Sequence, residues 1–233
     1  MQKRTKIITV SIIAGALVLG ATAAIAGPIV YRDLIVGEAD AAPSVTTTPQ
    51  GSSGTGEAAS DLSGDWAVVD GSFAGYRVDE VLNGTDVTVT GHTEDVTGTL
   101  TVDGLTLTSA SIEVDVASIA TDSGNRDEYF RSSALRTDEF PTAAFVLTEP
   151  ITVGSAPTVG KVQTVQATGD LTLAGVTRSV TVDLEAVLNG ADGQVAGSIP
   201  IIFADFGVEA PNLGFVSVEP TGFVEFSLVL ARA

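Results

Sequence analysis

The chain has 233 residues, contains no cysteine and carries a net charge of −18, with 29 acidic residues against 11 lysines and arginines. The lack of cysteine excludes disulfides, zinc–thiolate sites and thiol nucleophiles. The acidity argues against nucleic acid, because phosphate binding needs clustered Lys and Arg, and it disfavours docking onto an anionic membrane surface. We interpret it as a soluble, self-repelling outer surface on one domain of about 170 residues, long enough for a sizeable core.

Residues 1–36 have the pattern of a membrane-targeting segment. Three basic residues within 3–6 precede an uncharged run over 7–30, whose 24 residues would span roughly 36 Å as a helix, enough for a hydrocarbon core of about 30 Å. By the positive-inside rule the rest of the chain is extracytoplasmic. A cleaved signal peptide is the alternative, because residues 24–26 form a small-x-small site. The apolar run continues past that site, so we expect a retained single-pass anchor in the cell membrane, or a secreted domain if cleavage occurs.

Residues 37–60 are rich in Ala, Pro, Ser, Thr and Gly, which predicts a flexible linker. A tether of about 23 residues has a root-mean-square reach on the order of 25 Å, enough to hold a domain beside the membrane. The folded domain is therefore expected to occupy residues 61–233.

Most of this domain alternates apolar and polar residues, as antiparallel strands with one buried face do. In the strand expected at 177–187, for example, Val180, Val182 and Leu184 share one face. Both a sandwich and a closed barrel alternate in this way, so periodicity does not choose between them. The expected strands are 66–81, 86–91, 95–102, 105–119, 143–147, 162–173, 177–187, 194–203 and 222–230.

One short helix is expected to interrupt the strands within residues 118–145. Asn125 suits the N-cap position, and Glu128 three residues later completes a capping-box pattern. Pro141 prevents any continuation of the helix. The pattern predicts about three helical turns at most between two strands.

Three blocks of sequence resemble the YceI-like family, bacterial envelope proteins regarded as isoprenoid-lipid binders. They are T-x-x-x-x-R-D followed by F-P-T-x-x-F within 121–145, G-D-L-T-L-A-G-V-T-R-S-V at 169–180, and A-D-F-G-V at 204–208. The resemblance covers roughly residue 66 to the C-terminus. It implies an all-β, eight-stranded antiparallel, lipocalin-like β-barrel with one short inserted helix, whose interior holds side chains or one slender ligand.

The resemblance also implies a binding protein that sequesters or carries a long apolar isoprenoid-type lipid, with no cofactor. The residues themselves offer little for an enzyme, because a single histidine, His92, cannot build a multi-histidine metal site and no G-x-S-x-G motif is present. The alternative is an envelope interaction or stress-response module with a packed, ligand-free barrel. Composition and pattern do not decide the oligomeric state.

The candidate ligand-binding residues lie on the apolar faces of the expected strands, which are core positions by default. Two roles are open for Arg126. It either fixes the start of the helix by bonding to loop carbonyls, or faces a ligand head group such as a diphosphate from the barrel rim. The candidates are Ile112, Val114, Val116, Arg126, Phe145, Leu171, Leu173, Val180, Val182, Leu184, Val224, Phe226 and Leu228.

Overall fold

The computed structural model of the chain describes residues 39–47, 61–214 and 216–233. The expected anchor at 1–36 and the linker residues 48–60 lie outside the described residues. Within the described part of the chain, no helix is both long and apolar enough to cross a membrane.

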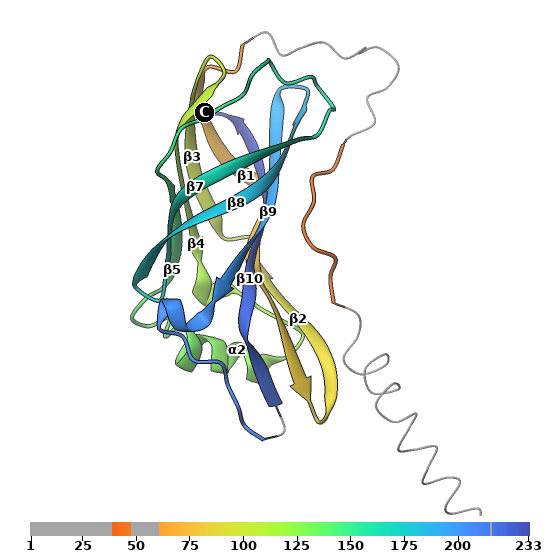
Figure 1. Ribbon diagram of the computed structural model, residues 1–233, viewed down its shortest axis with the longest axis vertical. Coiled ribbons are helices and arrows are strands. Elements are labelled where there is room, and N and C mark those ends of the chain that lie inside the picture. Colours follow the sequence, from red (N-terminus) through yellow and green to blue (C-terminus); the bar gives the residue numbers. More distant parts are fainter. Residues whose placement is uncertain (1–38, 48–60, 215) are drawn as a thin grey trace, which may run out of the picture.

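The strands form one antiparallel sheet that closes into a barrel (Figure 1). Eight strands follow the order β1-β3-β4-β5-β7-β8-β9-β10, and β10 pairs back with β1. β2 extends the sheet beyond β1, and the short β6 pairs with β4. The predicted all-β, eight-stranded antiparallel barrel with one short helix is therefore confirmed. The strands are β1 (Gly64–Leu82), β2 (Thr85–Thr93), β3 (Val96–Asp103), β4 (Thr106–Asp115), β5 (Thr142–Leu147), β6 (Ile151–Thr152), β7 (Gln163–Leu173), β8 (Val176–Asn189), β9 (Asp192–Ile202) and β10 (Val216–Arg232).

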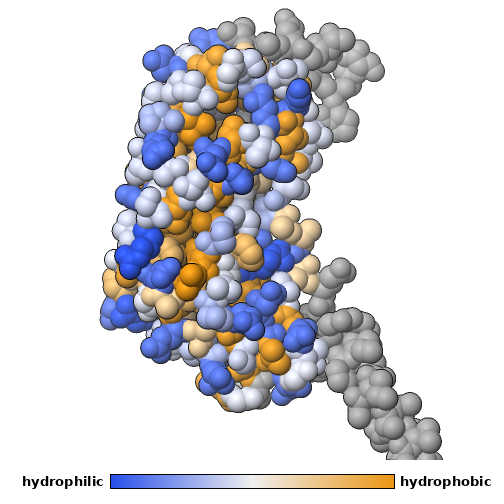
Figure 2. Space-filling model, in the orientation of Figure 1, coloured by the Kyte–Doolittle hydropathy of each residue, from blue (hydrophilic) through white to orange (hydrophobic). Residues whose placement is uncertain are grey.

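The alternation of side chains separates the barrel interior from its outer surface. On β8, for example, Val182 is buried, whereas its neighbours Thr181 and Asp183 are exposed. The outer positions carry most of the charge, and Figure 2 shows hydrophilic residues spread over the visible face with apolar groups between them. The pattern thus determines which face of each strand is buried.

β1 bends at Gly71, and its two halves pair with different strands on the side opposite β10. Gly71 adopts a φ of 91°, a conformation that residues with a side chain rarely take. The register with β10 shifts here, between Val69 and Phe73. Before the bend β1 pairs with β3, and after it with β2. The bend therefore carries the sheet from the barrel wall into the extension made by β2.

The helical insertion begins differently from the prediction. α2 (Gly124–Tyr129) starts one residue before Asn125 and passes directly into a π turn, η3 (Phe130–Ala134). The N-cap residue makes no side-chain capping bond, so the predicted capping box is wrong. Instead, the Asp127 carboxylate accepts bonds from the backbone N–H and the hydroxyl of Thr121, at 2.9 and 2.7 Å. The loop before α2, and not its own first turn, holds this carboxylate.

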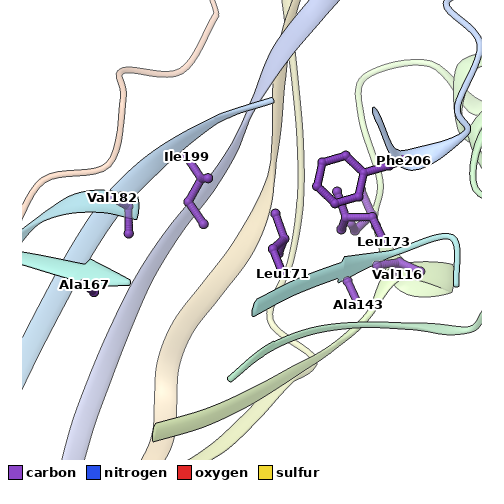
Figure 3. Close-up of a cluster of buried hydrophobic side chains, with 9 residues drawn as sticks. Val116, Ala143, Ala167, Leu171, Leu173, Val182, Ile199 and Phe206 are labelled. Carbon is purple, nitrogen blue, oxygen red and sulfur yellow. The ribbon is translucent and has the colours of Figure 1, made fainter. Parts of the chain in front are cut away.

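This insertion and a second short helix close one end of the barrel. The ring of Phe130 stacks on the ring of Tyr76, with centroids 5.0 Å apart. Tyr76 is largely buried here, and burial raises the pKa of its hydroxyl. Phe206 belongs to η4 (Phe203–Phe206) and is buried against Leu173 and Val116, the first residue of η2 (Val116–Ser118). Figure 3 shows Phe206, Leu173 and Val116 packed together. We call this packed region the closed end.

Residues 39–47, which composition assigns to the linker, lie along the outside of the barrel (Figure 1). Arg77 donates to the Asp40 carbonyl at 2.6 Å, and the Thr46 N–H donates to the Gln194 side chain at 2.8 Å. Asn189 donates to the Thr46 carbonyl at 3.0 Å. We call residues 39–47 the strap, because they bind to strands on two parts of the barrel wall.

Candidate functional site

The barrel encloses a cavity of about 290 Å³, near the lower end of the usual range for ligand pockets. All eight barrel strands contribute aliphatic or aromatic side chains to its wall. The cavity opens at the end of the barrel away from α2. We call this opening the mouth; it is bordered by the β3–β4 turn at Gly104 and Leu105, by Pro157 and Lys161 in the loop before β7, and by the β8–β9 hairpin.

Two of the aromatic rings in the cavity wall, those of Phe145 and Phe226, each lie over a glycine. A Cβ added at Gly169 would stand 2.7 Å from Cε2 of Phe145. One added at Gly197 would stand 2.8 Å from Cζ of Phe226 and 2.9 Å from Cδ2 of Leu184. Such approaches are too close for real side chains, so the glycines let both rings lie back against the wall. This arrangement keeps the cavity open.

We expect Gly197→Ala to weaken binding of an apolar fluorescent probe more than it weakens the fold. The added methyl group displaces the Phe226 and Leu184 side chains, and the cavity is the space into which they can turn. Overpacking in a core without such space costs about 1–3 kcal/mol. Probe titration and thermal unfolding, measured side by side, test this. Gly154→Ala is the control, because a Cβ there meets nothing within 4 Å. Probe binding equal to that of the control would contradict the proposed role of Gly197.

Most of the candidate residues from the sequence line this cavity. Their contact with a ligand stays a prediction, but the barrel brings them together from five strands. They are Ile112, Val114, Phe145, Leu171, Val182, Leu184, Val224, Phe226 and Leu228.

Three apolar candidates lie elsewhere, in the closed end. Val116 and Leu173 are buried beside Phe206, and Val180 packs against the same cluster. Figure 3 shows Val116 and Leu173 near Phe206, with Val182 farther away. The alternation had placed Leu173 and Val180 on the correct face of their strands, whereas Val116, expected in the strand 105–119, lies in η2 because that strand ends at Asp115. Alternation does not give the position of a residue along the barrel axis. That position determines whether an inward side chain contacts the cavity or the closed end.

Arg126 also lies at the closed end, away from the mouth. Its guanidinium meets Glu80 at 3.1 Å and Asp122 at 2.6 Å. The Glu80 side chain is only 5% exposed. Burial disfavours the charge of Arg126, but these two carboxylates outweigh it and hold its pKa above the ordinary value. The geometry supports a role in fixing the loop before α2 to β1, and a head-group contact stays a prediction.

Sequence reasoning missed the polar residues near the mouth. Lys161 is the one charged side chain among the described residues that line the cavity. Gln163 and Gln194 also border it, but the Gln194 side-chain amide bonds to Thr46 and Ser227. Lys161 is exposed. Lys161 is the only lysine after residue 6, and this rarity could have marked it in the sequence as a candidate functional residue. Its loop has no periodicity, however, so the pattern gave no reason to place it beside the cavity.

Comparison with known proteins agrees with this architecture. Residues 66–230 match the model of the YceI-like domain. The chain belongs to the YceI-like family. A curated relative, a UPF0312 protein of Shewanella denitrificans, is 30% identical over a 130-residue match that covers 52% of this chain and 64% of the relative. The match thus spans less than two thirds of that relative's length.

Two solved structures share the YceI-like barrel. A polyisoprenoid binding domain from Saccharophagus degradans, implicated in plant cell wall breakdown, is 20% identical with a TM-score of 0.59, covering 72% of this chain and 98% of that chain. BcnA of Burkholderia cenocepacia is 22% identical with a TM-score of 0.52, covering 66% of this chain and 95% of that chain. At these identities the likeness establishes the fold alone. The resemblance inferred from the three sequence blocks is confirmed.

Proposed function

We propose that this YceI-like protein sequesters or carries a long apolar isoprenoid-type lipid inside its barrel. The observation that carries the proposal is the cavity, which is apolar along its length and open at one end. Each CH₂ group moved from water is worth about 0.8 kcal/mol, so a long chain can bind without many polar contacts. The polyisoprenoid binding of the Saccharophagus degradans relative supports this ligand class. A packed, ligand-free barrel is disfavoured by the cavity.

The ligand that fits best is a hydrocarbon or has a neutral head group, such as a quinone. A diphosphate is held by several cationic or N–H donors at once. Among the described lining residues only Lys161 is charged, and Arg126 is engaged with Glu80 and Asp122 at the other end. The side-chain amide of Gln163 suits a neutral polar group near the mouth.

The proposed function includes a tether. The basic residues at 3–6 and the apolar run at 7–30 support a retained single-pass anchor, with the barrel on the extracytoplasmic side of the cell membrane. The protein would then hold its lipid close to a bilayer without the barrel itself entering it.

The test is to express the full chain in bacteria, purify it without added lipid, extract it with organic solvent and identify the extract by mass spectrometry. We expect a neutral isoprenoid lipid to be recovered in proportion to protein. An extract without lipid, or with only straight-chain fatty acids, would contradict the proposal. Recovery mainly of diphosphate-bearing isoprenoids would retain the carrier function and overturn the neutral head group.

A further inference from the structure

The strap runs along the barrel in a defined direction (Figure 1). Near its start, Arg77 donates to the Asp40 carbonyl. Near its end, the N–H groups of Val45 and Thr46 donate to the side chains of Glu185 and Gln194, at 3.3 and 2.8 Å. Hydrogen bonds at both ends hold the strap against the wall, so its direction is fixed relative to the cavity.

The barrel residues at the two ends of the strap lie at different levels. Arg77 follows Tyr76, whose ring stacks on Phe130 at the closed end. Gln194 and Asn189 belong to the β8–β9 hairpin, which borders the mouth. The chain therefore meets the barrel on the side of the closed end and runs toward the mouth.

This direction matters because the strap follows the expected anchor in the chain. The apolar run expected to cross the membrane ends at residue 30 and the strap begins at 39, so the intervening chain reaches about 30 Å at most. The nine strap residues, when extended, carry the chain up to roughly 30 Å further toward the mouth. A barrel on a wholly flexible linker of 37–60 would instead turn freely.

We propose that the strap holds the barrel with its closed end toward the tethering membrane and its mouth away from it. This inference rests on the proposed function, since it takes the anchor and the lipid cavity as given. Lipid then enters and leaves on the side facing away from the anchoring bilayer. The exchange partner is accordingly a lipid-bearing surface or carrier on that far side.

The absence of cysteine makes the orientation measurable, because a single introduced cysteine carries a single fluorophore. Asn125→Cys places the label on α2 at the closed end, and Ala191→Cys places it in the β8–β9 turn at the mouth; both positions are exposed. The full chain is reconstituted into phosphatidylcholine vesicles that contain a head-group quencher. We expect several-fold stronger quenching at residue 125 than at residue 191.

A second pair of variants tests the strap itself. Val45→Pro combined with Thr46→Pro removes both N–H donors, and Asn189→Ala added to them removes the bond to the Thr46 carbonyl. We expect the difference in quenching between the two labels to shrink towards zero in this variant. Ser44→Pro is the matched control, because Ser44 is exposed and takes part in none of these bonds, and it should keep the difference.

Equal quenching at both labels, or stronger quenching at residue 191, would overturn the orientation. A difference that persists in the variant with all three changes would overturn the role of the strap. A chain that fails to float with the vesicles would overturn the anchor and the orientation together. The lipid recovered by solvent extraction is measured independently, so that experiment tests lipid binding in the cavity separately from the orientation of the barrel.

Discussion

Replacing Val182 by phenylalanine should remove most of the bound lipid while leaving the thermal midpoint of the lipid-free protein nearly unchanged. Val182 lies on the inner face of β8 and lines the cavity. The larger ring occupies space that would otherwise hold about three CH₂ groups of a lipid chain. At about 0.8 kcal/mol each, their loss weakens binding on the order of 50-fold. Lipid recovery from purified protein and thermal unfolding after delipidation measure the two effects.

The same substitution separates the two views of the barrel. In a packed core, phenylalanine at this position would cost about 1–3 kcal/mol, and each kcal/mol lowers the midpoint by about 2–4 °C for a domain of this size. Ser179→Phe is the control, because Ser179 is exposed on the same strand and the ring would point outward. A clear fall in the midpoint of Val182→Phe, with no lipid in the wild-type protein, would favour the packed, ligand-free barrel.

The sequence was sufficient to predict the inward face of most strands. A period of two fixes which side chains face the interior, since a slip of one residue would expose the whole apolar set. Val182, Leu184 and Phe226 were identified in this way. The number of strands and the closure of the barrel came from the family resemblance, because a sandwich produces the same alternation.

The division between cavity and packed end could not be predicted from the strands alone. Val182 faces the cavity, whereas Leu173, equally apolar, is covered by Phe206 from a short helix that follows two strands later in the chain. The room beside Phe226 depends on its cross-strand contact with Gly197. Such contacts become known only when the register of the sheet is known.

The strap also left no signal in the sequence. Its composition of Ala, Pro, Ser and Thr is typical of a linker. The bonds from Val45 and Thr46 use backbone N–H groups, which nearly every residue has. The acceptors Glu185 and Gln194 lie about 140 residues away and read as ordinary outward-facing residues of strands.

The effect on stability should be largest at the closed end, where Arg126→Ala leaves a buried carboxylate without its partner. The Glu80 side chain is 5% exposed and pairs with Arg126 at 3.1 Å. Breaking a buried ion pair costs about 3–5 kcal/mol. Because the Arg126 side chain is 21% exposed, water screens part of its interaction with Glu80. We therefore expect the free energy of unfolding, measured by urea denaturation, to fall by about 2–3 kcal/mol.

Two further variants identify the cause of that loss. Combining Arg126→Ala with Glu80→Gln should recover part of the stability, because a neutral amide is less costly to bury than an unpaired carboxylate. Arg131→Ala removes an exposed pair with Glu128 at 3.8 Å and should change stability by less than about 0.5 kcal/mol. A loss at Arg126 that is no larger than the loss at Arg131 would contradict the role of the buried pair.

The same Arg126→Ala variant decides whether this arginine contacts ligand. The cavity mouth lies at the other end of the barrel, so affinities for a diphosphate-bearing isoprenoid and for its parent hydrocarbon should change equally, measured per folded molecule. Equal changes leave Arg126 with the structural role of joining the loop before α2 to β1. A loss confined to the diphosphate lipid would instead place a charged head group at the closed end, and would reverse the direction in which the lipid lies in the barrel.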